Sequence, residues 1–116
     1  MGDSFRDLQV WQRAIQLSLS VYRLTEGFPK DEVFGLTSQL RRAGVSVASN
    51  IAEGYGRMST GEYKQFLGIA RGSNSEVQTQ LVIAGELGYG NGEALKKAEA
   101  LSIEVGKMLL AMLRKL

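Results

Sequence analysis

Three short segments rich in glycine or proline divide the chain into four stretches with helical periodicity. These segments are EGFPKD (26–31), GYGRMSTG (54–61) and GYGNG (88–92). Glycine and proline interrupt regular structure, and the apolar residues between the segments recur at three- and four-residue steps rather than alternating. Because connections this short join antiparallel neighbours, the sequence predicts an all-α, antiparallel up-down-up-down four-helix bundle that forms a single domain over residues 1–116.

The same pattern predicts where each helix begins and ends. The expected helices are about 6–25, 32–53, 60–87 and 92–115. Ser59 and Asn91 are the expected N-caps of the last two helices, because their side-chain oxygens can accept backbone N–H groups of the first turn. Glu62, three residues after Ser59, completes a capping box.

The first helix is apolar over more of its surface than a bundle core requires. Its main stripe is Val10, Ala14, Leu17, Val21 and Leu24. A neighbouring stripe contains Leu8, Trp11, Ile15 and Tyr22. The two stripes together cover about 200° of the helix, whereas a helix that contacts only its own bundle needs a narrower apolar face. We therefore expect a second partner surface on this helix, with Trp11 at least partly buried.

The composition excludes several chemistries. The chain has no cysteine and no histidine, which excludes disulfides, thiol nucleophiles, imidazole bases and the usual zinc ligands. We therefore predict a protein that is not an enzyme and that carries no cofactor and no metal. No apolar run approaches the roughly 20 residues of a membrane span, and acidic residues precede the first apolar stretch, unlike a secretory signal. A cytoplasmic location is expected.

Charge is balanced along the sequence. The chain has 14 basic and 12 acidic residues, a net charge of +2. Residues 1–58 and 59–116 each contain seven of the basic and six of the acidic residues. Because neither half forms a charged tail, bulk charge alone does not indicate a nucleic-acid partner.

A line of cations on the fourth helix is the candidate nucleic-acid contact. Lys96, Lys107 and Arg114 fall within about 20° of one another on that helix. Four further candidates are Lys97, Lys115, Arg41 and Arg42. Such a line can contact phosphates. The alternative is an ordinary solvated helix face, because glutamates are interspersed with the lysines.

A polar, weakly helix-forming patch, 72–76, interrupts the strong third helix. Together with the second helix it offers Asn50, Glu53, Ser73 and Glu76 near one contact line. A catalytic carboxylate pair would need Glu53 and Glu76 close together and buried. Because no histidine or cleft-forming loop accompanies them, we expect the four residues to form a structural hydrogen-bond network. Glu76→Ala should then cost about 1–3 kcal/mol of stability.

The glycine-rich turn at 54–57 has a simpler expected role. It matches neither the dinucleotide fingerprint nor the P-loop, and no strand precedes it. We expect it to cap the C-terminus of the second helix and to begin the turn before Ser59.

Seven motifs along nearly the whole chain, taken together, resemble one known family. They are Phe5-x-x-Leu8-x-Val10-Trp11, Phe28-Pro29, Glu32-x-Phe34-Gly35-Leu36, Gln39-Leu40-Arg41-Arg42-Ala43, Asn50-Ile51-Ala52-Glu53-Gly54, Phe66-Leu67-x-Ile69-Ala70-x-Gly72-Ser73 and Glu76-x-Gln78-Thr79-Gln80-Leu81. In this order and spacing they are similar to the bacterial four-helix-bundle proteins also called 23S rRNA-intervening-sequence proteins.

The resemblance implies an assembly and suggests a function. Members of this family look like antiparallel four-helix bundles that form rings of five, so the chain itself is the first expected partner, as a homopentamer. A related branch is the accessory protein of diversity-generating retroelements, a basic pentamer that binds nucleic acid and a reverse transcriptase. The resemblance therefore implies a non-catalytic oligomeric nucleic-acid-binding or ribonucleoprotein accessory module, with RNA or DNA as partner. The alternative is a protein-interaction scaffold that docks a polypeptide and binds no nucleic acid.

Overall fold

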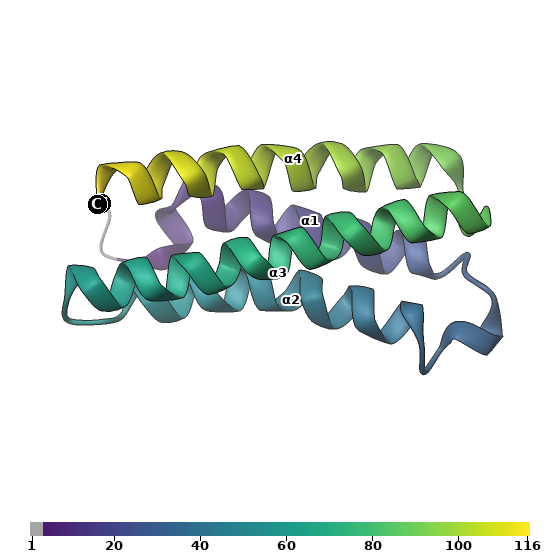
Figure 1. Ribbon diagram of the computed structural model, residues 1–116, viewed down its shortest axis with the longest axis horizontal. Helices are drawn as coiled ribbons and strands as arrows, with labels where there is room; N and C mark the ends of the chain where they lie inside the picture. Colours follow the sequence, from purple (N-terminus) through teal and green to yellow (C-terminus); the bar gives the residue numbers. More distant parts are fainter. Residues whose placement is uncertain (1–3) are drawn as a thin grey trace.

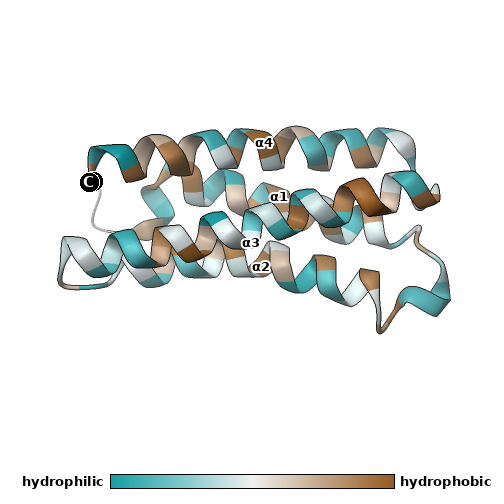
Figure 2. Cartoon of the chain, in the orientation of Figure 1, coloured by the Kyte–Doolittle hydropathy of each residue, from teal (hydrophilic) through white to brown (hydrophobic). Residues whose placement is uncertain are grey.

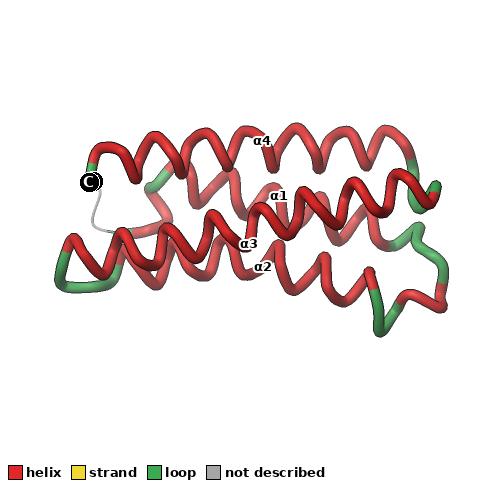
Figure 3. Tube along the Cα trace, viewed as in Figure 1, coloured by secondary structure: helices red, strands yellow, loops and turns green. Residues whose placement is uncertain are grey.

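Four antiparallel helices make up most of the chain in the computed structural model, which describes residues 4–116 (Figures 1 and 3). They are α1 (Gln9–Thr25), α2 (Leu36–Tyr55), α3 (Thr60–Leu87) and α4 (Gly92–Lys115). Two 3-10 turns, η1 (Phe5–Asp7) and η2 (Lys30–Glu32), precede α1 and α2. Within the described residues there is no strand, and the predicted all-α class is confirmed.

Each helix packs against its neighbours in sequence, and α1 packs against α4 to close the bundle. The contact between α2 and α3 is the most extensive, whereas the backbones of the diagonal pairs, α1 with α3 and α2 with α4, stay more than 8 Å apart between Cα atoms within residues 4–116. The bundle measures 43 × 24 × 22 Å along its principal axes. This arrangement is the predicted up-down-up-down topology.

The first two helices begin three or four residues later than the sequence predicted. Leu8 has extended backbone angles, so the chain forms the turn η1, capped by Ser4, before α1 begins at Gln9. Gly35, with φ −115° and ψ −118°, interrupts the second helix. The Glu32 carboxylate then accepts the Leu36 N–H at 2.9 Å and caps α2.

The last two helices have the predicted bounds and caps. Ser59 accepts the Glu62 N–H at 3.2 Å, and the Ser59 hydroxyl donates to the Glu62 carboxylate at 3.3 Å. Asn91 accepts the N–H groups of Glu93 and Ala94 at 2.9 and 3.1 Å. These side chains satisfy donors that have no partner within the helix.

The core consists of two hydrophobic clusters that follow one another along the bundle axis. The first contains Leu17, Val21, Leu24, Phe28, Leu36, Leu40, Ala43, Val77, Leu81, Ala84 and Ala98. The second contains Val10, Ala14, Val47, Ala48, Ile51, Leu67, Ala70, Val105 and Leu109. Apolar and polar residues alternate along every helix in Figure 2, as expected when one side of each helix faces this core. The main stripe predicted for the first helix is fully buried.

Helices α2 and α3 lie close together at Gly54. This residue lies inside α2 and is buried, and a Cβ added there would lie 2.7 Å from Phe66 Cβ and 3.1 Å from Tyr63 Cδ1. The predicted C-cap within the 54–57 turn is Gly56, and α2 continues to Tyr55, two residues beyond the predicted helix end. Glycine is needed at position 54 because α3 lies too close to α2 there to leave room for a Cβ atom.

We expect Gly54→Ala to destabilise the protein by about 1–3 kcal/mol, because the added methyl group overpacks the contact between α2 and α3. Gly68→Ala is the matched control, since a Cβ at this exposed position of α3 meets no atom within 4 Å. There alanine should stabilise the helix by about 0.5–1 kcal/mol. Urea denaturation of both variants measures the difference, and equal midpoints would contradict the close approach at Gly54.

Candidate functional site

A layer of hydrogen-bonded polar side chains separates the two hydrophobic clusters. Between α2 and α3, the Ser46 and Ser73 hydroxyls share a hydrogen bond of 2.8 Å. The Asn50 amide donates to both the carbonyl and the hydroxyl of Ser46 at 2.9 Å. Two of the four residues predicted to form a polar network, Asn50 and Ser73, are therefore brought together by Ser46.

The same layer connects α3 to α4. The Asn74 amide donates to the Ser102 carbonyl at 2.9 Å, and the Ser102 hydroxyl donates back to Asn74 Oδ1 at 2.8 Å. Asn74 is 3% exposed and Ser102 is 0% exposed. Gly106 makes room for this pair, since a Cβ there would lie 3.1 Å from the Asn74 amide nitrogen. Reciprocal hydrogen bonds between buried groups define how far α3 can slide along α4.

The two glutamates predicted to belong to this network lie outside it. Glu53 is exposed and pairs with Arg57 at 2.7 Å, one turn further along. Glu76 is exposed, and within residues 4–116 it has no hydrogen bond or ion pair. Because both carboxylates face solvent, they form neither the structural network nor a buried catalytic pair.

We expect Asn74→Ala to cost about 1–3 kcal/mol of stability, because it leaves the buried Ser102 hydroxyl without its acceptor. Glu76→Ala, which removes an exposed carboxylate two residues away, should change stability by less than about 0.5 kcal/mol. Thermal or urea unfolding compares the two variants. A greater destabilisation by Glu76→Ala than by Asn74→Ala would contradict this assignment.

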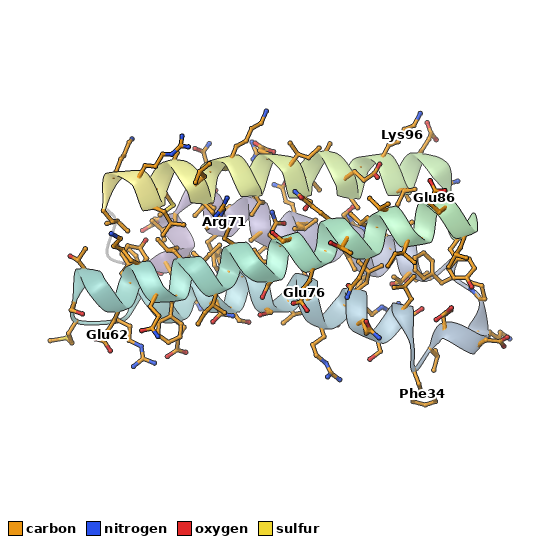
Figure 4. All side chains as sticks on the ribbon, viewed as in Figure 1. Phe34, Glu62, Arg71, Glu76, Glu86 and Lys96 are labelled. Atoms are coloured by element: carbon orange, nitrogen blue, oxygen red, sulfur yellow. The ribbon has the colours of Figure 1, made fainter. Side chains whose placement is uncertain are left out.

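The predicted cations of the fourth helix are all exposed. Lys96, Lys97, Lys107, Arg114 and Lys115 lie on the solvent side of α4. Figure 4 shows Lys96 near the start of α4, at the opposite end from the chain terminus. The line of charges that the sequence predicted is therefore accessible.

The two arginines of α2 are separated from this line, because α2 and α4 lie diagonally across the bundle. Arg41 is half-buried: its Nε donates to the Thr25 hydroxyl at 2.8 Å, and its guanidinium lies 4.6 Å from the centre of the Tyr22 ring. These contacts join α2 to α1 and give Arg41 a structural role. Arg42 is exposed.

Two cations of α3 were not among the contact residues predicted from the sequence. Arg71 lines a groove between α3 and α4 together with Lys107, and Figure 4 shows Arg71 between the two helices. Lys64 is exposed and lies seven residues before Arg71, which places it on the same face of α3. Their seven-residue spacing was visible in the sequence, but their position beside the fourth helix depends on the register of the bundle.

The tyrosines with shifted pKa values lie outside this groove. Burial, with a smaller contribution from Tyr55, raises the pKa of Tyr63. The hydrogen bond from the Tyr89 hydroxyl to Glu32, 3.1 Å long, raises the pKa of Tyr89. Raised values favour the neutral phenol, so neither hydroxyl is prepared to act as a base near neutral pH.

Two further features are absent from the described part of the chain. Among residues 4–116, no three carboxylates gather in a way that could hold a metal ion. Each helix in the same range is too polar or too short to cross a lipid bilayer.

Comparison with known proteins agrees with the arrangement of the helices. Residues 6–111 match the family described as 23S rRNA-intervening sequence protein. The chain belongs to this family. The resemblance seen in the seven motifs is thereby confirmed, and no curated protein sequence matches the chain.

A solved structure shares the fold of this family member. It is a crystal structure of a protein of unknown function from the S23 ribosomal protein family of Bacteroides thetaiotaomicron, with a TM-score of 0.80. It is 20% identical to this chain, and the alignment covers 90% of this chain and 97% of that one. Neither the family description nor that of the solved protein indicates catalysis.

Proposed function

We propose that this member of the 23S rRNA-intervening sequence family is a non-catalytic, homo-oligomeric module that binds RNA or DNA, as an accessory to a ribonucleoprotein or nucleic-acid process in the cytoplasm. The observation that carries the proposal is the groove between α3 and α4 that Arg71 and Lys107 line, at the end of α4 where Arg114 is also exposed. Positive charge gathered on one surface attracts phosphate backbones without the need for base-specific contacts.

An apolar groove between α1 and α2 supports self-association. It is lined by Phe5, Trp11, Ile15, Ser18, Val45, Ala48, Ser49 and Ala52. The Trp11 ring is half-buried and lies 5.2 Å from the Phe5 ring, edge to face. Leu19, Tyr22 and Val45 continue the apolar surface and are each more than 40% exposed. Leu8, Trp11 and Ile15 of the second stripe are only half-buried in a single bundle, and Tyr22 is exposed. This incomplete burial favours a second copy, in a ring of five, as the partner of the stripe.

Assembly explains how a weakly charged chain could bind a polyanion. One subunit with a net charge of +2 offers few phosphate contacts. A ring of five copies would carry about +10 and would repeat each cationic surface by symmetry. Several weak contacts made together raise the affinity beyond that of any one of them.

The assembly can be tested with Val45→Glu. Val45 lines both the apolar groove and the neighbouring hollow beside Tyr22 and Arg41. A carboxylate at this position should oppose any subunit contact that buries the apolar groove. Multi-angle light scattering at micromolar concentration should give a multiple of 12.7 kDa for the wild type and a smaller species for the variant. A wild-type mass of 12.7 kDa would contradict the oligomer.

Nucleic-acid binding can be tested with a Lys107/Arg114 double-alanine variant. Filter binding or mobility shift at about 50 mM salt should detect binding by the wild type and weaker binding by the variant, with affinity falling steeply as salt rises. If both proteins are equally indifferent to RNA and DNA, the nucleic-acid function is wrong. A scaffold for a polypeptide partner would then be the better interpretation.

A further inference from the structure

Charge is unevenly distributed along the bundle, although it is balanced along the sequence. The polar layer divides the bundle into two ends, and the end that contains residues 4–17, 47–75 and 102–116 is called the basic end here. Its eight basic residues are Arg6, Arg13, Arg57, Lys64, Arg71, Lys107, Arg114 and Lys115. Its four acidic residues are Asp7, Glu53, Glu62 and Glu104. At the other end, residues 18–46 and 76–101, seven acidic residues outnumber six basic ones.

Ion pairs occupy two of the four carboxylates at the basic end. Glu53 binds Arg57 at 2.7 Å, and Glu104 binds Arg13 at 3.0 Å. The first pair lies at the C-terminal end of α2, and the second joins α4 to α1. Within the described residues, neither glutamate forms an ion pair with Arg71 or Lys107, the cations between α3 and α4.

The two helical segments that meet at this surface contain no acidic residue. Residues 63–75 of α3 and 105–116 of α4 carry five cations and no carboxylate side chain. The hydrogen bonds between Asn74 and Ser102 set the antiparallel register of the two helices. In that register Arg71 faces Lys107, with which it lines one groove, and Lys64 is placed seven residues further along, opposite Arg114.

The result is two pairs of cations, spaced about 10 Å apart along the bundle, since seven helical residues rise by that distance. Between the helices the groove is lined by polar and small residues, namely Asn74, Ser75, Gln78 and Gly106, with Ile103 and Leu110 on the α4 side. Among the described residues, those that line the groove around Arg71 and Lys107 include no aromatic ring on which a base could stack. A backbone of repeating phosphates matches this arrangement better than a single small anion does.

Lys96 and Lys97 belong to the opposite end. Figure 4 shows Lys96 close to the end of α3 that carries Glu86 and far from Arg71. Glu93 and Glu99 lie one turn on either side of Lys96 along α4. These carboxylates therefore weaken the positive electrostatic potential around the exposed lysines at this end.

We infer that the basic groove, defined by Lys64, Arg71, Lys107 and Arg114, is the surface through which the protein contacts the sugar–phosphate backbone of its nucleic acid, and that Lys96 and Lys97 contribute little. This inference rests on the proposed function and narrows it to one face of each subunit. We expect binding to be independent of base sequence, because positive charge and groove shape recognise the sugar–phosphate backbone and not the base edges.

The test compares two quadruple variants in which the same number of charges is removed. The basic-groove variant carries Lys64→Gln, Arg71→Gln, Lys107→Gln and Arg114→Gln. The control carries Arg23→Gln, Arg42→Gln, Lys96→Gln and Lys97→Gln, which removes two lysines and two arginines from exposed positions at the other end. Fluorescence anisotropy with labelled duplex DNA, hairpin RNA and single-stranded RNA at about 50 and 200 mM salt measures affinity and salt slope.

We expect the basic-groove variant to bind at least tenfold more weakly than the wild type at about 50 mM salt. The slope of log K against log salt should flatten by about 0.7–0.9 for each phosphate that the variant no longer neutralises. The control should keep its affinity within about threefold of wild type. Circular dichroism melts confirm that both variants fold, and the half variants Lys64→Gln with Arg71→Gln, and Lys107→Gln with Arg114→Gln, should each bind with intermediate affinity.

The outcomes separate this inference from the function on which it rests. If the wild type binds and both quadruple variants weaken equally, or the basic-groove variant binds like wild type, the assignment of the groove is wrong while the function stands. If the wild type binds none of the three probes at about 50 mM salt, where phosphate contacts are strongest, the proposed function fails and the groove assignment fails with it.

Discussion

The reciprocal hydrogen bonds between Asn74 and Ser102 are the constraint on which the rest of this structure depends. Apolar stripes bring α3 and α4 together, but leucine, valine and alanine side chains tolerate sliding by a turn far better than a buried amide and hydroxyl do. A shift in register would leave both groups unpaired in the core, where each costs free energy comparable to a missing hydrogen bond. The hydrogen bond between Ser46 and Ser73 applies the same constraint between α2 and α3, and Asn50 holds Ser46 in place from one turn along α2.

This polar layer also determines which charged residues of α3 and α4 lie side by side on the surface. With the register set, Arg71 lies beside Lys107, and the acid-free segments of α3 and α4 face one another at one end of the bundle. Each helical hairpin returns the chain to the end where it started, so every end of the bundle combines pieces from both halves of the sequence. For this reason the bundle has a basic end, although the two halves of the sequence carry the same numbers of basic and acidic residues.

Much of the fold could be predicted from the sequence because its signals are local. The apolar stripe from Val10 to Leu24, the caps Ser59 and Asn91 and the glycine-rich turns each act within a few residues. The polar layer could be predicted only in part. Ser73 and Asn50 were found from their position on the contact line, and helical spacing places Ser102 on the buried stripe of the fourth helix. Its partner Asn74 lies 28 residues away, so the pairing itself has no local signal. The glutamates show the opposite error, because Glu53 and Glu76 were placed near the contact line from their helical spacing, yet both are exposed to solvent.

The six lysines of the chain provide the most direct test of where nucleic acid binds, because three lie at each end of the bundle. Lysine acetylation read by mass spectrometry, with and without a saturating RNA hairpin, compares their accessibility in the unmodified protein. We expect protection of Lys64 and Lys107, which belong to the basic groove, while Lys30, Lys96 and Lys97 react as they do in the free protein. Protection of Lys96 and Lys97 equal to that of Lys64 and Lys107 would contradict this expectation.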